Sequence, residues 1–171
     1  MRLLKGRSDL HFPLIKPPGV TGALLYDYSV LIMGQVNFVL YTQKNSLISV
    51  DNISNKKFDI RTTSAHIQHF DFPIKTSAQY TSAIRMVSMG RIDGFIFVDK
   101  LVDPVIKAYA LSNIRRQFYK AFDMGAVLPK GQRGNELDIK LAEGLKRLQD
   151  KGWYLPLVQG VGVSDYDDWQ P

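Results

Sequence analysis

The chain contains no cysteine, which excludes disulfides, thiolate metal sites and cysteine nucleophiles and leaves the redox compartment open. It also lacks any run of the ~18 apolar residues that a membrane-spanning helix needs, and its first residues do not have the basic-then-apolar pattern of an export signal. These absences predict a soluble protein without an export signal. A length of 171 residues suffices for one large or two small domains.

Blocks of like charge are absent as well. The formal net charge is +6, but Lys and Arg are interspersed with acids and form only short pairs such as Lys56-Lys57 and Arg115-Arg116. This pattern disfavours nucleic-acid binding. There is no glycine-rich phosphate loop and no Gly-x-Ser-x-Gly motif. The acids of "SDYDDW" at residues 164–169 are interpreted as a solvated tail, so catalysis finds little support.

One short motif, Gly-Arg-x-Asp, occurs twice, at residues 6–9 and 90–93. In "LLKGRSDLHF" and "VSMGRIDGFIF" alike, an apolar segment leads into the glycine and apolar residues follow the aspartate. Glycine tolerates the left-handed conformation that ends a helix, so each copy is interpreted as a joint between a helix and a strand. Taken alone, the match is equally consistent with chance, because such joints recur in α/β proteins.

Apolar periodicity predicts alternating helices and strands. A helix is expected over 76–89, capped by Thr76 or Ser77 and ended by Gly90, and another runs from the Asp103-Pro104 start to about residue 118. A third helix, capped by Asn135 and ended by Gly152, carries the apolar stripe Leu137, Leu141, Leu145 and Leu148. Strands are expected over 36–42 and 56–60, and short buried strands over 94–98 and 125–129. This alternation predicts an α/β fold with open, largely parallel sheets.

The order of these elements resembles a known family. The runs "AIRMVSMGRIDGFIFVDKLVDPVIKAYA" and "AVLPKGQRGNELDIKLAEGLKRLQDKGWYLPLV" are similar to bacterial extracytoplasmic solute-binding proteins of polar-amino-acid ABC transporters, which have the periplasmic-binding-protein type II fold. The earlier runs "LLKGRSDLHFP" and "YDYSVLIMGQVNFVLYTQK" resemble the first-lobe segment of the same family. The likeness covers most of the chain and is specific over residues 79–158.

The resemblance implies an α/β protein of two lobes joined by crossing hinge strands. Lobe 1 would comprise residues 1–41 and 119–171, and lobe 2 residues 42–118. Relatives begin with a further strand-helix-strand portion of lobe 1, so the resemblance implies an incomplete lobe 1. The chain would then be a fragment or a mis-started reading frame, or another chain would supply the missing part, or ligand binding would have been lost.

The function implied is capture of a small polar, amino-acid-like ligand between the lobes, for ABC-type transport or sensing. Hinge closure would occur about residues 36–42 and 118–127. The expected partners are a membrane permease or a membrane-bound sensor, with self-association through the incomplete lobe as a further interaction. The expected location is the periplasm, with no cofactor and no nucleic acid. Alternatives are a dehydratase-like enzyme on the same fold and a non-binding remnant or interaction module.

In lobe 2, the candidate ligand-binding residues follow two strands. Thr62, Thr63 and Ser64 can offer hydroxyl and backbone N–H groups to a carboxylate, and they match the anion-binding turn of the family. A helix cap without a ligand is an equal alternative. Asp99 matches the family's acid that receives an ammonium group, while its alternative role is to cap the following helix.

In lobe 1, the resemblance points to Phe12, Tyr28 and Ser29, although core packing is the more frequent role of Phe and Tyr. The family's amino-acid binders carry an arginine seven residues before that serine, where this chain has Gly22, and Lys16 is a nearby alternative cation. His66 and His69 have the spacing of metal ligands on a helix. No third ligand is obvious, so surface or capping roles and no metal are expected.

Overall fold

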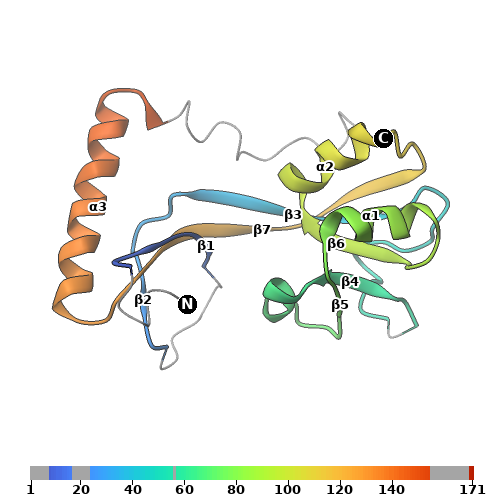
Figure 1. Ribbon diagram of the computed structural model, residues 1–171, viewed down its shortest axis with the longest axis horizontal. Coiled ribbons are helices and arrows are strands. Elements are labelled where there is room, and N and C mark those ends of the chain that lie inside the picture. Colours follow the sequence, from blue (N-terminus) through green and yellow to red (C-terminus); the bar gives the residue numbers. More distant parts are fainter. Residues whose placement is uncertain (1–7, 17–23, 56, 155–169) are drawn as a thin grey trace. The chain divides into compact units, whose positions relative to one another are not determined.

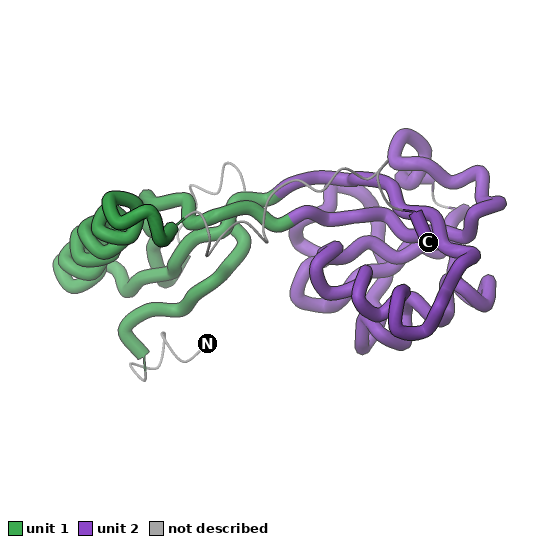
Figure 2. The backbone as a smooth tube through the Cα atoms, turned by 90° about the horizontal axis from the view of Figure 1, so that it is seen from above, with its two compact units in different colours: residues 1–36, 122–162 green, residues 37–121, 163–171 purple. Residues whose placement is uncertain are grey.

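The computed structural model describes residues 8–16, 24–55, 57–154 and 170–171. The chain divides into two compact units, shown in Figure 2: unit 1 comprises Met1–Val36 and Phe122–Gly162, and unit 2 comprises Asn37–Ala121 and Val163–Pro171. Two long strands, β3 (Gly34–Gln43) and β7 (Ile114–Leu128), each contain residues of both units. The first Gly-Arg-x-Asp copy lies partly outside the described residues, and "SDYDDW" lies wholly outside them.

Unit 1 is built around the second half of β7. The strands β1 (His11–Ile15) and β2 (Asp27–Tyr28) both pair with β7 in the antiparallel sense, and the helix α3 (Gln132–Asp150) follows it. The prediction that Asn135 caps α3 is wrong, because its N–H already bonds the carbonyl of Gly131 at 3.1 Å inside the helix. Gly152, with φ 68°, follows the end of the helix as predicted.

Unit 2 contains the strands β3, β6 (Gly94–Val98), β4 (Ile60–Thr63) and β5 (Lys75–Ser77), which are neighbours in that order. β4 is parallel to β5 and β6, whereas β3 is antiparallel to β6. The sheet is therefore mixed, which corrects the prediction of a largely parallel one. The predicted strand 56–60 is also displaced, because pairing with β6 begins only at Ile60.

Two helices of unit 2, α1 (Tyr80–Ser88) and α2 (Asp99–Ala108), pack on each other and on β6 (Figure 1). α1 ends before Gly90, which has φ 67° as the motif predicts. Its predicted caps Thr76 and Ser77 are wrong, because both residues belong to β5, which pairs with β4.

The helix predicted from Asp103 is also corrected. α2 begins at Asp99, contains Pro104 and ends at Ala108, and the left-handed Ala110 (φ 50°) separates it from β7. Residues 114–118 are therefore strand, as is most of the segment predicted as a separate strand over 125–129.

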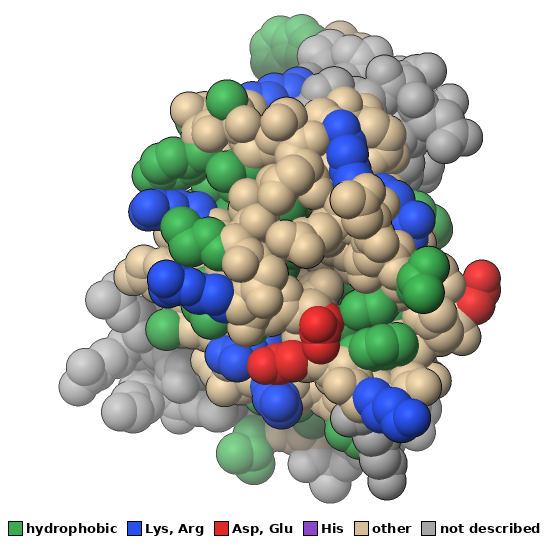
Figure 3. Space-filling model, turned by 90° about the vertical axis from the view of Figure 1, so that its right-hand side faces the viewer, with side chains coloured by type: hydrophobic (Ala, Val, Ile, Leu, Met, Phe, Trp, Pro, Cys, Tyr) green, Lys and Arg blue, Asp and Glu red, His purple; other side chains and the backbone are tan. Residues whose placement is uncertain are grey.

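The core of unit 2 lies on β3 and β6, where every residue from Asn37 to Thr42 and from Gly94 to Val98 is buried. A continuously buried strand of this kind was predicted for 94–98. On the face in Figure 3, Lys and Arg side chains are spread over the surface rather than gathered into one patch. Within the described residues, no helix has the length and apolar character needed to cross a membrane.

Candidate functional site

Two parallel strands bring the predicted lobe 2 residues to one edge of the sheet in unit 2. β4 pairs with β6 through Ile60 opposite Gly94 and Arg61 opposite Phe95, so both strands end at the same edge. Thr62 and Thr63 form the end of β4, and Asp99 directly follows β6. Edges of this kind, at the carboxyl ends of parallel strands, are where α/β proteins bind ligands.

The three hydroxyl residues have different environments. Thr62 is buried, and its Oγ1 makes no hydrogen bond to any residue that the structure describes. The Thr63 hydroxyl bonds His66 Nδ1 at 2.7 Å, and Ser64 is exposed at the first position of the short 3-10 helix η2 (Ser64–His69). Thr62 therefore has an unused hydrogen-bonding group, whereas the Thr63 hydroxyl already has an internal partner.

Asp99 is only 1% exposed, and it occupies the first turn of α2. One carboxylate oxygen accepts the N–H of Lys100 at 2.6 Å, and the other accepts the side-chain amide of Asn37 on β3 at 3.4 Å. The alternative role considered for this residue, capping the following helix, is wrong, because Val98 is the N-cap of α2 and Asp99 is the first residue inside the helix. Asn37 was not predicted, although a single amide within the apolar run "VNFVL" is the signal that could have identified it.

His66 and His69 lie among aromatic rings of unit 2. The His66 ring is edge-on to Phe38 at 5.3 Å and to Phe97 at 5.2 Å between ring centroids. Burial, followed by the charge of His69, lowers the pKa of His66 to about 4, and burial lowers the pKa of His69. Both imidazoles are therefore neutral at physiological pH. Among the described residues, no group of three His, Cys, Asp or Glu side chains could hold a metal ion.

A buried ion pair between β7 and α2 of unit 2 was not predicted. Arg116 on β7 contacts Asp103 on α2 at 2.5 Å, and the Tyr41 hydroxyl donates to Asp103 at 2.8 Å. Burial raises the pKa of Asp103, although Tyr41 and Arg116 oppose this effect. The Gln170 side chain hydrogen-bonds the backbone N–H and carbonyl of Arg116 at 2.9 and 3.2 Å. This network joins α2, β3, β7 and the end of the chain within unit 2.

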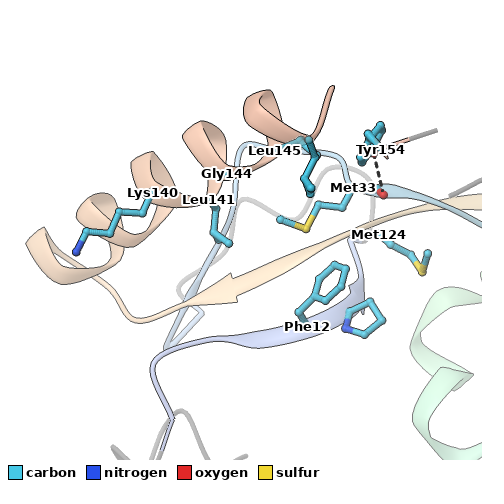
Figure 4. Close-up of a pocket in the computed structure, with 10 residues that line it drawn as sticks. Phe12, Met33, Met124, Lys140, Leu141, Gly144, Leu145 and Tyr154 are labelled. Atoms are coloured by element: carbon cyan, nitrogen blue, oxygen red, sulfur yellow. Dashed lines mark hydrogen bonds between the residues drawn. The ribbon is translucent and has the colours of Figure 1, made fainter. Parts of the chain in front are cut away.

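The predicted lobe 1 residues lie in unit 1, and Gly22 lies outside the described residues. Ser29 is buried, and its hydroxyl donates to Asp138 on α3 at 2.5 Å, while Lys16 Nζ donates to the Ser29 carbonyl at 3.0 Å. Burial, followed by Tyr26, raises the pKa of Tyr28 to about 12. Phe12 is half exposed on β1 and lines an apolar cavity of about 580 Å³ beside α3 (Figure 4).

Comparisons of the sequence identify no relative: no protein-family model matches the chain, and no curated protein does.

Solved structures, in contrast, match most of the chain. The arginine-, lysine- and histidine-binding protein ArtJ of Geobacillus stearothermophilus gives a TM-score of 0.66 at 18% identity, covering 98% of this chain and 76% of that one. A histidine kinase sensor domain with similarity to periplasmic binding proteins gives 0.69 at 16%, covering 90% and 69%. An ancestral amino-acid-binding protein, a precursor of cyclohexadienyl dehydratase, gives 0.67 at 17%, covering 94% and 71%. This chain therefore has the two-lobed α/β fold of the periplasmic binding proteins, which confirms the fold predicted from its sequence.

Proposed function

We propose that this chain is a solute-binding domain that captures a small polar, amino-acid-like ligand in the periplasm, for ABC-type transport or for sensing. The fold supports this proposal, as do the similarities to ArtJ, which binds arginine, lysine and histidine, and to a histidine kinase sensor domain. The proposal retains the lobe boundaries predicted from the sequence, 1–41 with 119–171 and 42–118. It also retains hinge closure about 36–42 and 118–127, with a membrane permease or a membrane-bound sensor as the partner.

One observation carries the proposal: the buried Thr62 hydroxyl has no hydrogen-bond partner among the described residues, at the sheet edge that also holds Asp99. An unsatisfied buried hydroxyl costs the free protein about 1–3 kcal/mol, so such groups call for an explanation. A ligand carboxylate at the end of β4 would accept a hydrogen bond from Thr62. Ser64, which is exposed at the same turn, would offer a second hydroxyl.

The other candidate residues of lobe 2 determine which charged groups of a ligand this sheet edge can bind. Asp99 supplies the negative charge expected to receive an ammonium group, and Asn37, which bonds it, holds the carboxylate in place. The Thr63 hydroxyl is hydrogen-bonded to His66, so Thr63 would influence the ligand indirectly, by holding the His66 ring in place. The two neutral histidines supply no positive charge. At this edge the ligand's carboxylate would therefore be bound through hydroxyl and N–H groups rather than through a histidine cation.

In lobe 1, Phe12, Tyr28 and Ser29 remain part of the proposal. The Ser29 hydroxyl donates to Asp138 and accepts the N–H of Leu31, so it can only accept a further hydrogen bond, through its second lone pair. Ser29 would therefore contact a donor such as an ammonium group rather than a carboxylate. Phe12 and Tyr28 would contribute apolar ring surface.

Isothermal titration calorimetry of the full chain against the common amino acids, with arginine, lysine and histidine included, tests this function. We expect saturable binding of at least one of them. Asp99→Asn should weaken that binding at least about ten-fold, which corresponds to about 1.4 kcal/mol. Asp51→Asn, which changes an exposed carboxylate in the loop before β4, should leave it unchanged. A folded protein that binds no amino acid would contradict the proposal.

The dehydratase alternative predicts product formation from a cyclohexadienyl substrate. Turnover that Asp99→Asn abolishes would favour the enzyme over the binding protein, whereas binding without turnover would favour our proposal.

A further inference from the structure

The apolar cavity of unit 1 lies between α3 and the strands below it. Figure 4 shows Leu141 and Leu145 of α3 directed toward Met33, with Phe12 on β1 and Met124 on β7. Its volume of about 580 Å³ is left unfilled by the described residues, and Phe12 remains 50% exposed beside it. The cavity is therefore an apolar hollow that the described residues of unit 1 leave open to a partner.

The leucines of α3 present their side chains as a continuous stripe. Leu141, Leu145 and Leu148 follow one another at four- and three-residue intervals, and none of them is fully buried. Residues at these intervals share one face of a helix, and this pattern is how an amphipathic helix meets another helix. The stripe is therefore suited to contact another helix, and the described residues do not cover one side of it.

Gly144 lies within this open side. It lines the cavity in the middle of α3, and a Cβ built on it would meet no atom within 4 Å among the described residues. Glycine within a helix costs about 1 kcal/mol relative to alanine, and nothing in the described fold requires it here. A glycine at this position allows the backbone of a partner to approach α3 closely.

The charges beside the cavity are basic. Lys140 is the one charged residue among the described residues that line it. Arg147 and Lys151 lie seven and eleven residues further along α3, so they share its flank with Lys140. Glu136 and Glu143 lie further from the leucine stripe, and Glu143 pairs with Arg147 at 3.7 Å, which leaves Lys140 and Lys151 as the cations that a partner would meet. A partner that covers the stripe would meet positive charge at its edge.

Two other occupants fit less well. An added strand would have to pair with β1, but Pro13 lacks an N–H and the pairing of β1 with β7 is irregular between His11 and Leu14, features that oppose strand addition. A second copy of α3 would bring two sets of Lys140, Arg147 and Lys151 together. The occupant that fits both the stripe and its charge is a different helix.

We propose that this cavity is the docking site for an amphipathic helix of a partner polypeptide, with an apolar stripe and acidic flanks. The stripe of that helix would fill the space between α3, Phe12 and Met33, and its backbone would pass over Gly144. Its Asp or Glu side chains would pair with Lys140 and Lys151. This contact uses none of the proposed ligand-binding residues of unit 2, whereas it shares Phe12 with the proposed ligand contacts of lobe 1.

Fluorescence anisotropy with designed peptides tests this surface. One labelled peptide carries leucines at three- and four-residue intervals flanked by glutamates, and a second carries the same leucines flanked by lysines. We expect the full chain to bind the glutamate peptide at least about ten-fold more tightly, a difference of about 1.4 kcal/mol. Circular dichroism should show that the glutamate peptide gains helix on binding.

Two variants of α3 form a matched pair. Leu145→Lys places a charge in the stripe and should weaken binding of the glutamate peptide at least about ten-fold. Ile139→Lys changes an exposed apolar residue of the same helix, outside the cavity, and should leave binding unchanged. Circular dichroism should confirm that both variants keep their helices.

Three results would overturn the proposal. The first is equal binding of the two peptides, and the second is an equal effect of Leu145→Lys and Ile139→Lys. The third is a dimer of the full chain in analytical ultracentrifugation that Leu145→Lys dissociates, because a second copy would then be the occupant. Conversely, Lys140→Glu should weaken binding of the glutamate peptide and strengthen binding of the lysine peptide, which a general attraction to apolar peptides does not explain.

Discussion

Replacing Thr62 by valine separates the stability of the free protein from its affinity for a ligand. The substitution keeps the shape of the side chain and removes a buried hydroxyl that has no partner among the described residues. Because that hydroxyl is desolvated without compensation, its loss should raise the free energy of unfolding by about 1 kcal/mol. If the hydroxyl donates to a ligand carboxylate, the lost bond should cost about 1.5–3 kcal/mol of binding, or at least about ten-fold in Kd.

Thr42 provides a matched control for this experiment. It is also buried in a strand with an unpartnered Oγ1 among the described residues, but it pairs with Gly94 at the start of β6, the end opposite to Asp99. Thr42→Val should therefore raise the free energy of unfolding as Thr62→Val does, without changing the Kd. Urea unfolding and calorimetry measure the two quantities. Equal Kd values for the wild type and Thr62→Val would refute the assigned contact.

Three further experiments test the packing, burial and charge of the free protein. Asp103→Ala should lower the free energy of unfolding in urea by about 3–5 kcal/mol, because it removes the carboxylate that pairs with the buried Arg116 guanidinium, whereas Glu143→Ala at an exposed pair should change it by about 0.5 kcal/mol or less. The pKa of His66 is lowered from 6.5 to about 4, so the unfolded chain takes up a proton at a higher pH than the folded protein. The free energy of unfolding should therefore fall as pH decreases from 6.5 to about 4, and a weaker fall in His66→Phe would confirm the source. Gly144→Ala should raise the melting temperature through helix propensity, worth about 1 kcal/mol, whereas Gly134→Ala should lower it, because its Cβ would lie 1.9 Å from the Pro129 carbonyl oxygen.

Local backbone chemistry made part of the fold predictable. Gly90 and Gly152 have the positive φ that ends a helix, and the apolar run 94–98 forms a strand buried on both faces, as the sequence indicates. Helix starts were less predictable, because capping residues also occur in strands. Thr76 and Ser77 have cap chemistry, but pairing with β4 places them in β5. The sense of strand pairing is a long-range property, so the antiparallel position of β3 beside β6 had no local signal.

The position of the candidate site could be predicted from the sequence, but the side chains that contact its residues could not. Strand ends placed Thr62, Thr63 and Asp99 at one edge, and the parallel pairing of β4 with β6 agrees with that placement. Asn37 and Arg116 lie far from this edge in sequence, so only tertiary contacts bring them to the carboxylates of α2. A charged or amide side chain within an apolar strand sequence indicates a buried polar contact. An analysis of hydrophobic periodicity alone does not detect this signal.

The two predicted halves of the binding site differ in how much of their hydrogen-bonding capacity is already used. In unit 1, the Ser29 hydroxyl donates to Asp138 and accepts from Leu31, so the folded unit satisfies it without a ligand. In unit 2, Thr62 is as deeply buried but has no such partner among the described residues. A ligand gains most from groups that the free protein leaves unsatisfied, because binding then replaces a desolvation cost with a bond. Ligand affinity should therefore depend more strongly on Thr62 than on Ser29, and comparing Kd for Thr62→Val and Ser29→Ala, with the fold of each variant checked by circular dichroism, decides between the two halves.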